Sequence, residues 1–203
     1  MLNIFARASV SRVTDPIGAW LVRAGLTANA VTVIGTAGAV GGALWLFPTG
    51  HLLAGTFVVW GFAMFDLLDG AMARAKGGGT RFGVVLDATC DRIADGALYA
   101  ALAWYFFVET GNRPLAGAAL VCLVLAQVTS YVKARAEATG LTADGGLVER
   151  AERLIITLVG AGLTGFGVPH AIDVALWLLV GLSVVTVVQR MIAVWRSAGE
   201  VLA

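Results

Sequence analysis

The chain has 203 residues, of which 59% are hydrophobic and only 13% are charged. A soluble domain is nearer half apolar and a quarter charged, so this composition argues against an ordinary soluble protein and favours a membrane protein. The net charge of +1 argues against a nucleic-acid partner, because proteins that bind DNA or RNA carry a clustered excess of basic residues.

The first twenty-odd residues place apolar side chains among scattered arginines. This pattern predicts an N-terminal amphipathic helix that lies in the membrane interface. Its apolar residues are Phe5, Val10, Ile17, Trp20 and Leu21. The stretch Thr27–Ala30 follows and supplies capping residues for the first long apolar segment.

Six apolar segments follow, most of them long enough to cross about 30 Å of hydrocarbon. No repeat or low-complexity linker interrupts them, so we expect an all-α polytopic membrane protein in which residues 1–203 form a single domain with six transmembrane helices. The expected segments are Ala30–Phe47, Leu52–Arg74, Gly83–Val108, Leu115–Ala136, Leu154–Phe166 and Ile172–Trp195.

Basic residues mark one side of these segments. Thirteen of the fourteen lysines and arginines fall in or near alternate connections and the two chain ends, and only Arg113 lies in an opposite connection. The positive-inside rule makes the basic side cytoplasmic. We therefore expect a multi-pass protein of the cytoplasmic membrane with both termini in the cytoplasm.

Four aspartates lie inside apolar segments. Asp66 and Asp69 are i,i+3 neighbours at the end of the second segment, and Asp87 and Asp91 are i,i+4 neighbours at the start of the third. The short connection makes these helices antiparallel neighbours, so all four carboxylates are expected to converge at one depth.

Four carboxylates at that depth cannot all stay ionised without counter-charge. Divalent cations with oxygen ligands supply it, and two ions about 4 Å apart could share carboxylates and clamp a phosphate. Buried ion pairs with Arg74 and Arg92 are the alternative, but two arginines cannot neutralise four aspartates. A divalent-cation transporter is a further alternative, although the outer halves of the segments lack the polar groups that a pathway needs.

Small residues lie beside the aspartates. Gly70, Ala73 and Gly83 would let a ligand approach the helix backbones closely. Arg74 offers a planar fork of donors for a phosphate group. Taken together, these residues are expected to line one cleft.

The aspartates, small residues and arginine form one pattern, Asp66-x2-Asp69-Gly70-x2-Ala73-Arg74-x8-Gly83-x3-Asp87-x3-Asp91. It resembles the complete signature of the CDP-alcohol phosphotransferases. The resemblance implies transfer of a phospho-alcohol group from a CDP-alcohol to a second alcohol, with release of CMP. It also implies that Asp66, Asp69, Asp87 and Asp91 hold two Mg²⁺ ions, with Mn²⁺ as a possible substitute, and that Asp91 is the general base. The family usually forms homodimers.

Within this family, the polar segments resemble the bacterial synthases of phosphatidylinositol phosphate. The stretches are residues 11–16, 25–32, 77–83 and 130–137. The resemblance implies CDP-diacylglycerol as the donor and inositol phosphate as the acceptor. The residues expected to contact CDP-diacylglycerol are Asn29, Ala30, Val31, Thr32, Gly70, Ala73, Arg74, Thr80 and Gly83. Ala28 departs from the pattern, since such proteins usually have proline there.

Basic residues near the ends of segments four to six are candidates for acceptor binding. Lys133, Arg153 and Arg190 lie at or inside the apolar boundary and resemble the acceptor-phosphate residues of the synthases. An acceptor that already carries phosphate needs such a cluster, which favours inositol phosphate and leaves glycerol phosphate as the alternative. For Arg135 and Arg150, snorkelling to lipid phosphates is an equally good interpretation. Asp95 is expected to support the site without being a ligand.

Overall fold

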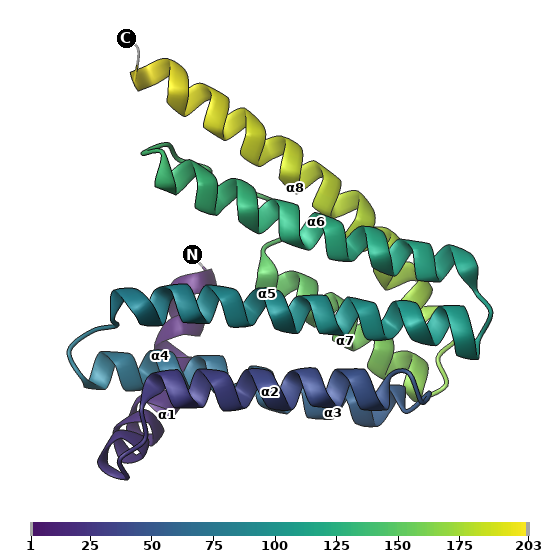
Figure 1. The fold of residues 1–203 in the computed structure, drawn as a ribbon, viewed down its shortest axis with the longest axis horizontal. Coiled ribbons are helices and arrows are strands. Elements are labelled where there is room, and N and C mark those ends of the chain that lie inside the picture. The colour runs from purple at the N-terminus through teal and green to yellow at the C-terminus, as the bar shows by residue number, and fades with distance from the viewer. Residues whose placement is uncertain (1, 202–203) are drawn as a thin grey trace. The chain divides into compact units, whose positions relative to one another are not determined.

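The fold is that of a computed structural model, which describes residues 2–201 of the chain and the side chains of residues 12–199. Every regular element in the described residues is a helix, as predicted (Figure 1). In chain order these are α1 (Leu2–Arg23), α2 (Ala28–Leu46), α3 (Leu52–Ala63), α4 (Phe65–Ala75), α5 (Arg81–Trp104), the π-helix η1 (Tyr105–Glu109), α6 (Arg113–Ala138), α7 (Arg150–Gly165) and α8 (Ala171–Val201).

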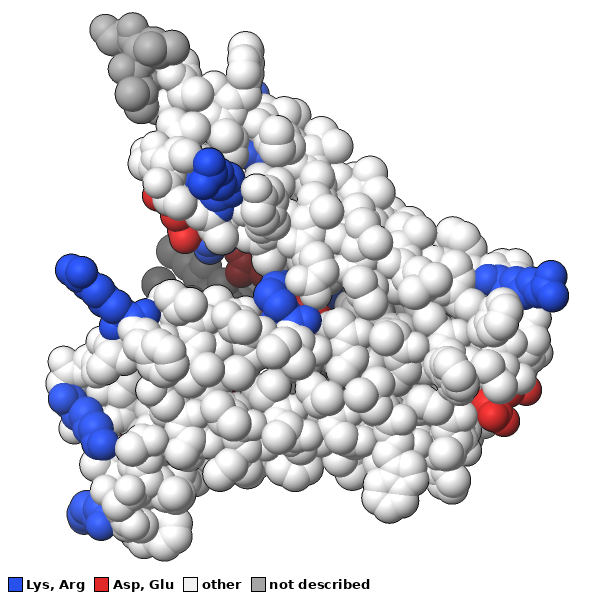
Figure 2. Space-filling view, in the orientation of Figure 1, with Lys and Arg blue, Asp and Glu red and all other residues white. Residues whose placement is uncertain are grey.

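The helices α2, α6, α8 and the continuous segment Leu52–Ala75 are long and apolar enough to cross a membrane. Large apolar side chains remain exposed on the protein surface, including Trp45 and Trp195 at 74% and 77%. Broad stretches of the face in Figure 2 carry no charged side chain. These features identify a membrane protein, because lipid covers apolar surface that water would not.

The other two predicted segments are helical, but by length and composition alone they do not qualify as membrane-spanning helices. α7 has 16 residues, which span roughly 24 Å, less than the hydrocarbon thickness. α5 has the length, but it carries five charged residues, which lower its apolar character. Six helical segments are therefore confirmed, and six crossings stay a prediction.

The segment predicted as one helix from Leu52 to Arg74 is broken at Met64, where α3 ends and α4 begins. The Leu67 N–H donates to the Met64 carbonyl three residues earlier, at 3.1 Å, rather than four. The break places Asp66 in the first turn of α4. Met64 keeps helical backbone angles, and its N–H still donates to the Trp60 carbonyl at 3.2 Å, so α3 and α4 remain one continuous segment.

Two compact units make up the chain, and each is described by itself. The first comprises Met1–Ala43 and Phe57–Ala94. Its glycines allow helices to approach closely: a Cβ added at Gly35 on α2 would lie 2.6 Å from Phe65 Cβ, and one at Gly18 on α1 would lie 2.8 Å from Ala71 Cβ. This close packing brings α1 and α2 against α4, the helix that carries Asp66 and Asp69.

The second unit comprises Leu44–Thr56 and Asp95–Ala203. In it α8 packs against both α6 and α7, and Figure 1 shows α6 and α8 running side by side. A Cβ added at Gly160 on α7 would lie 2.6 Å from Ala175 Cβ on α8. The core between these helices is formed by small and aliphatic side chains, among them Ala119, Leu158 and Leu176, which are fully buried.

Candidate metal centre and substrate-binding residues

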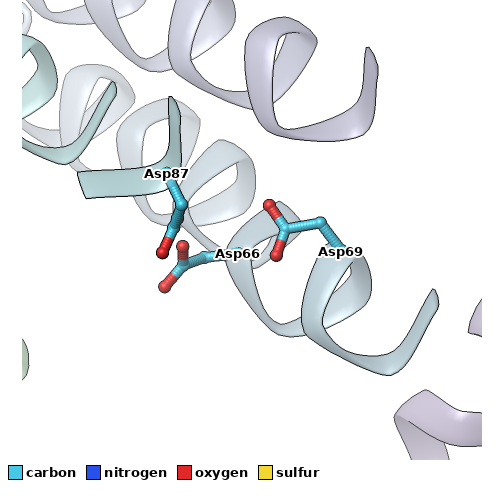
Figure 3. Close-up of side chains that lie close together, drawn as sticks. All are labelled: Asp66, Asp69 and Asp87. Carbon is cyan, nitrogen blue, oxygen red and sulfur yellow. The ribbon is translucent and has the colours of Figure 1, made fainter. Parts of the chain in front are cut away.

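Three of the four predicted metal ligands lie together in the first unit. Asp66 and Asp69 project from α4 and Asp87 from α5, with carboxylates directed toward one another (Figure 3). One oxygen of each lies within 4.8 Å of the others. Asp66 is exposed, Asp87 is half-buried and Asp69 is 9% exposed, so the cluster is open on the side of Asp66.

The spacing of these oxygens fits a hard divalent cation. Carboxylate oxygens bind Mg²⁺ at about 2.0–2.1 Å and Ca²⁺ at about 2.3–2.6 Å, so oxygens that share one ion lie at most about 4.2 Å apart for Mg²⁺ and about 5.2 Å apart for Ca²⁺. Oxygens within 4.8 Å meet the limit for Ca²⁺, and a shift of about 0.6 Å brings them within the limit for Mg²⁺. Three carboxylates this close also repel one another strongly, which a bound cation reverses. The donor set, all oxygen and all anionic, is the set that such ions prefer.

The fourth predicted ligand, Asp91, is not part of this group. It lies four residues beyond Asp87 on α5, half-buried, with an oxygen 3.8 Å from the Arg92 guanidinium. The expected convergence of four carboxylates is therefore found for three. About one helical turn, roughly 6 Å, separates Asp91 from Asp87 along the axis of α5.

Thr32 supports a metal ligand directly. Its hydroxyl donates to Asp69 Oδ2 at 2.5 Å, linking α2 to α4. A charge-assisted hydrogen bond of this kind fixes the carboxylate and partly offsets the cost of burying it. The sequence pattern indicated Thr32 only as a contact of CDP-diacylglycerol, because a hydrogen bond between residues 37 positions apart has no local signal.

Three other predicted donor-contact residues lie together where α2 and α5 begin. The Thr80 hydroxyl accepts from the Gly83 N–H at 2.9 Å, as the N-terminal cap of α5. A Cβ added at Gly83 would lie 3.1 Å from Thr80 Oγ1 and 3.3 Å from Asn29 Oδ1. Thr27 caps α2 as predicted, since its hydroxyl accepts from the Ala30 N–H at 3.2 Å.

Val31 differs from its neighbours, because its side chain is only 4% exposed and its N–H donates to the Thr27 carbonyl. It therefore packs in the core of the first unit. Ala30 is half-buried in the first turn of α2.

The remaining donor-contact candidates are on α4. Gly70 and Ala73 are half-buried, and Arg74 is exposed. The Arg74 NH2 group donates to Asp15 Oδ1 on α1 at 2.7 Å. The sequence did not predict this ion pair. It indicated Arg74 as a partner either of the clustered aspartates or of a phosphate. Both side chains are about half exposed, so the pair contributes little to stability.

The predicted acceptor residues lie in the second unit. Lys133 is half-buried on α6, whereas Arg153 on α7 and Arg190 on α8 are 3% and 5% exposed. Arg190 donates through Nε to the Gly145 carbonyl at 3.1 Å and through NH1 to the Thr129 carbonyl at 2.8 Å. It thus holds the connection between α6 and α7, a role that the sequence did not indicate.

Other side chains on α8 hold the same connection. The Thr186 hydroxyl accepts from the Val148 N–H, the Gln189 carbonyl oxygen from the Leu147 N–H, and the Ser197 hydroxyl from the Thr142 N–H. Thr186, Gln189 and Arg190 are spaced i, i+3 and i+4, so they share one face of the helix. That spacing is the signal by which a polar face of α8 could have been found.

Asp95 binds two arginines of α7. Its Oδ1 accepts from Arg150 Nε at 3.4 Å, and its Oδ2 lies 3.6 Å from Arg153 NH2. Asp95 is 5% exposed. The expected supporting role of Asp95 thus has a structural basis, and Arg150 is drawn inward rather than left wholly to snorkel.

Comparisons with known proteins agree with this description. The family model described as CDP-alcohol phosphatidyltransferase matches residues 25–189. The chain is 55% identical over 203 residues to the phosphatidylinositol phosphate synthase of Mycobacterium tuberculosis, covering 98% of this chain and 94% of that protein.

Two crystal structures of a synthase of that name from M. tuberculosis are similar at 57% identity. The one with CDP-DAG bound gives a TM-score of 0.89 over 93% of this chain and 96% of that chain. The one in complex with manganese and citrate gives 0.88 over 92% and 90%. The match of the family model and the similarity along nearly the whole chain agree, and this chain belongs to the CDP-alcohol phosphatidyltransferase family.

Proposed function

We propose that this enzyme transfers the phosphatidyl group from CDP-diacylglycerol to inositol phosphate, forming phosphatidylinositol phosphate and releasing CMP. The observation that carries the proposal is the cluster of Asp66, Asp69 and Asp87 on the family signature, with carboxylate oxygens within 4.8 Å. The names of the similar proteins support the choice of substrates, since they are phosphatidylinositol phosphate synthases and one structure holds CDP-DAG.

Two divalent ions, Mg²⁺ or Mn²⁺, would be held by Asp66, Asp69 and Asp87, with Asp91 contributing to one of them. The manganese complex of a similar synthase supports a divalent ion. When bound, such ions polarise the diphosphate and neutralise the charge that collects on departing CMP. The chain's own part is to fix the ligands, and the Thr32 hydroxyl does this for Asp69.

The donor nucleotide would lie along α2, α4 and the start of α5. Asn29, Thr80 and Gly83 are close together there, and the absent Cβ of Gly83 leaves space beside two polar side chains. Gly70 and Ala73 present a surface of small residues on α4. Arg74 has five N–H donors, so its contact with Asp15 leaves donors for the diphosphate.

Asp91 would act on the acceptor. Its carboxylate takes the proton of the acceptor hydroxyl as that oxygen attacks the phosphorus bearing diacylglycerol. The bond between this phosphorus and the CMP phosphate oxygen breaks, and CMP leaves with the bonding electrons. With such ions bound, a direct attack would be sufficient, with no covalent enzyme intermediate. The proton then passes from Asp91 to solvent.

The acceptor phosphate would be bound by Lys133, Arg153 and Arg190. Arg153 carries the strongest support, because its Nε and NH2 atoms are buried and make no hydrogen bond to the described residues. A buried guanidinium with unused donors is costly unless a ligand takes them up, and a phosphate does so with strong charge-assisted bonds. Free inositol would offer no charge to balance this group.

Charge removal at this site should weaken acceptor binding selectively. In Arg153→Gln or Lys133→Gln we expect KM for inositol phosphate to rise about ten- to a hundredfold, because each charge-assisted phosphate contact is worth about 1.5–3 kcal/mol. KM for CDP-diacylglycerol should change little. Arg190→Gln should show the same increase together with lower stability, since Arg190 also holds two backbone carbonyls.

The matched control for these variants is Arg113→Gln, at the exposed start of α6. Steady-state kinetics of the parent and the four variants, each with one substrate saturating, provide the measurement. Acceptor kinetics that stay at the parent's values in all three test variants would contradict the pocket and reopen the choice of an unphosphorylated alcohol.

An acceptor panel tests the function itself. Purified protein with CDP-diacylglycerol and Mg²⁺ is given inositol phosphate, glycerol phosphate, inositol or serine, and both CMP and lipid products are measured. We expect the highest kcat/KM with inositol phosphate. A preference for glycerol phosphate would change the acceptor but not the chemistry, and absence of CMP release with every acceptor would contradict a transferase.

The arrangement in the membrane is inferred from the apolar surfaces, the distribution of basic residues and the usual assembly of the family. We propose that all six helical segments cross it as one domain, with both termini cytoplasmic and the chain paired as a homodimer. On α1, Val13, Ile17 and Trp20 are 64%, 42% and 61% exposed at spacings of four and three residues. This apolar stripe would lie in the interface, with Gly18 of the same helix packed on α4.

A further inference from the structure

Asp95 is a buried carboxylate for which the proposed chemistry has no direct use. It lies on α5 in the second unit, 5% exposed, and meets two arginines that are i,i+3 neighbours at the start of α7. Arg150 donates to one of its oxygens at 3.4 Å, and Arg153 lies 3.6 Å from the other. One carboxylate therefore bridges two guanidinium groups.

A second pair holds the same two helices one turn further along. The Tyr99 hydroxyl and the Thr157 hydroxyl are 3.2 Å apart, and both side chains are at most 2% exposed. Tyr99 follows Asp95 by four residues and Thr157 follows Arg153 by four, so the two pairs lie one above the other. The register of α5 against α7 is thus set by two successive polar contacts.

The bridge leaves Arg153 restrained but not satisfied. The 3.6 Å separation is an ion pair rather than a hydrogen bond. The Nε and NH2 atoms of Arg153 make no hydrogen bond to the described residues, although the side chain is buried. A guanidinium held in place with unused donors is prepared for an anionic ligand, because little conformational freedom remains to be lost on binding.

We propose that Asp95 is a positioning residue for the acceptor, which it serves by fixing the orientation of the Arg153 guanidinium, whose buried Nε and NH2 donors stay available for a ligand. The inference rests on the proposed function, since it names the residue that prepares the acceptor-phosphate site. Asp95 itself does not touch the acceptor. A carboxylate in contact with the phosphate would repel it, so its effect must pass through Arg153.

The direction of the change in KM distinguishes positioning from simple electrostatics. Asp95→Asn removes a negative charge near an anion-binding arginine. If Asp95 acted only through its charge, the variant would bind inositol phosphate more tightly and KM would fall. If Asp95 orients Arg153, KM should rise about tenfold, as for the loss of a side chain that orients a ligand-binding group.

The experiment measures kcat and both KM values for the parent, Asp95→Asn, Arg153→Gln and the double variant. We expect Asp95→Asn to raise KM for inositol phosphate about tenfold with KM for CDP-diacylglycerol unchanged. In the Arg153→Gln background, Asp95→Asn should add nothing to the acceptor KM, because the side chain through which it acts is absent. The matched control is Asp173→Asn, which removes a half-buried carboxylate paired with the exposed His170.

The double variant also serves as a control for misfolding. It lacks one of the two arginines whose charge Asp95 offsets, so the loss of Asp95 leaves less unbalanced buried charge in it than in Asp95→Asn alone. An acceptor KM that falls or stays unchanged in Asp95→Asn would overturn the inference, as would an equal and independent effect of Asp95→Asn in the Arg153→Gln background. A parent that does not use inositol phosphate would overturn the proposed function, and this inference with it. A parent that uses it, with an unresponsive Asp95→Asn, would overturn this inference alone.

Discussion

Replacing Asp66 or Asp87 by alanine should abolish metal-dependent binding of the nucleotide. Each supplies one of three carboxylates whose oxygens lie within 4.8 Å, and they come from different helices, α4 and α5. Loss of a residue that only orients a metal ligand costs about ten- to a hundredfold in metal affinity or activity, so loss of a ligand should cost at least about a hundredfold. Turnover should be lost together with binding.

Equilibrium binding of CDP to purified protein, titrated with Mg²⁺ and then Mn²⁺, measures this effect. Asp66→Asn and Asp87→Asn separate charge from shape, because an asparagine keeps one oxygen but cannot neutralise a cation. Asp173→Asn again serves as control, being an aspartate on the first turn of α8 and in the second unit. CDP affinity equal to the parent's in either alanine variant would contradict the metal centre.

Local spacing predicted well that the carboxylates of Asp66, Asp69 and Asp87 lie close together. Asp66 and Asp69 are one turn apart, a short connection returns the chain, and Asp87 then lies opposite both. Each step depends on helix periodicity and on a connection too short to allow another arrangement. The same reasoning put Asp91 in the cluster, but the structure does not place it within the group. Asp87 and Asp91 share a face of α5, but a shared face does not show which of the two residues lies level with Asp66 and Asp69 on α4.

Contacts between distant segments could not be predicted. The Asp69–Thr32, Arg74–Asp15 and Arg190–Gly145 pairs join residues that are 37, 59 and 45 positions apart. These contacts depend on which helix faces pack together. Stripes of glycine allow helices to approach closely, but they do not determine which faces meet. The break at Met64 has a similar origin, since neither proline nor an adjacent glycine marks it in the sequence.

Membrane crossings are recognised by average hydropathy, which the charged residues of a functional site lower. α5 carries Asp87 and Asp91 together with Arg81, Arg92 and Asp95, and these five charged residues lower the average hydropathy by which a crossing is recognised. A membrane helix that binds metal ions and a phosphorylated substrate must contain such residues. Composition therefore fails to identify α5 as a crossing, although it does identify the segment Leu52–Ala75, which carries Asp66 and Asp69.

Asp91→Asn should separate chemistry from binding. The substitution removes the proposed base while Asp66, Asp69 and Asp87 keep their mutual spacing, so CDP-diacylglycerol should still bind in the presence of Mg²⁺. Turnover should fall about 10²–10⁴-fold, the range supplied by a positioned general base. Asp91 lies outside the 4.8 Å cluster, which is why binding and turnover are expected to respond differently here and together in Asp87→Ala.

The measurement pairs a CDP-diacylglycerol binding assay with initial rates of CMP release at saturating inositol phosphate. Asp91→Glu is the informative companion, because it restores a carboxylate displaced by one methylene and should recover part of the rate if proton removal is the role of Asp91. Parental turnover in Asp91→Asn would remove Asp91 from the mechanism. Loss of CDP-diacylglycerol binding equal to that in Asp87→Ala would make Asp91 a metal ligand first, and the base would then have to be sought elsewhere on the acceptor side.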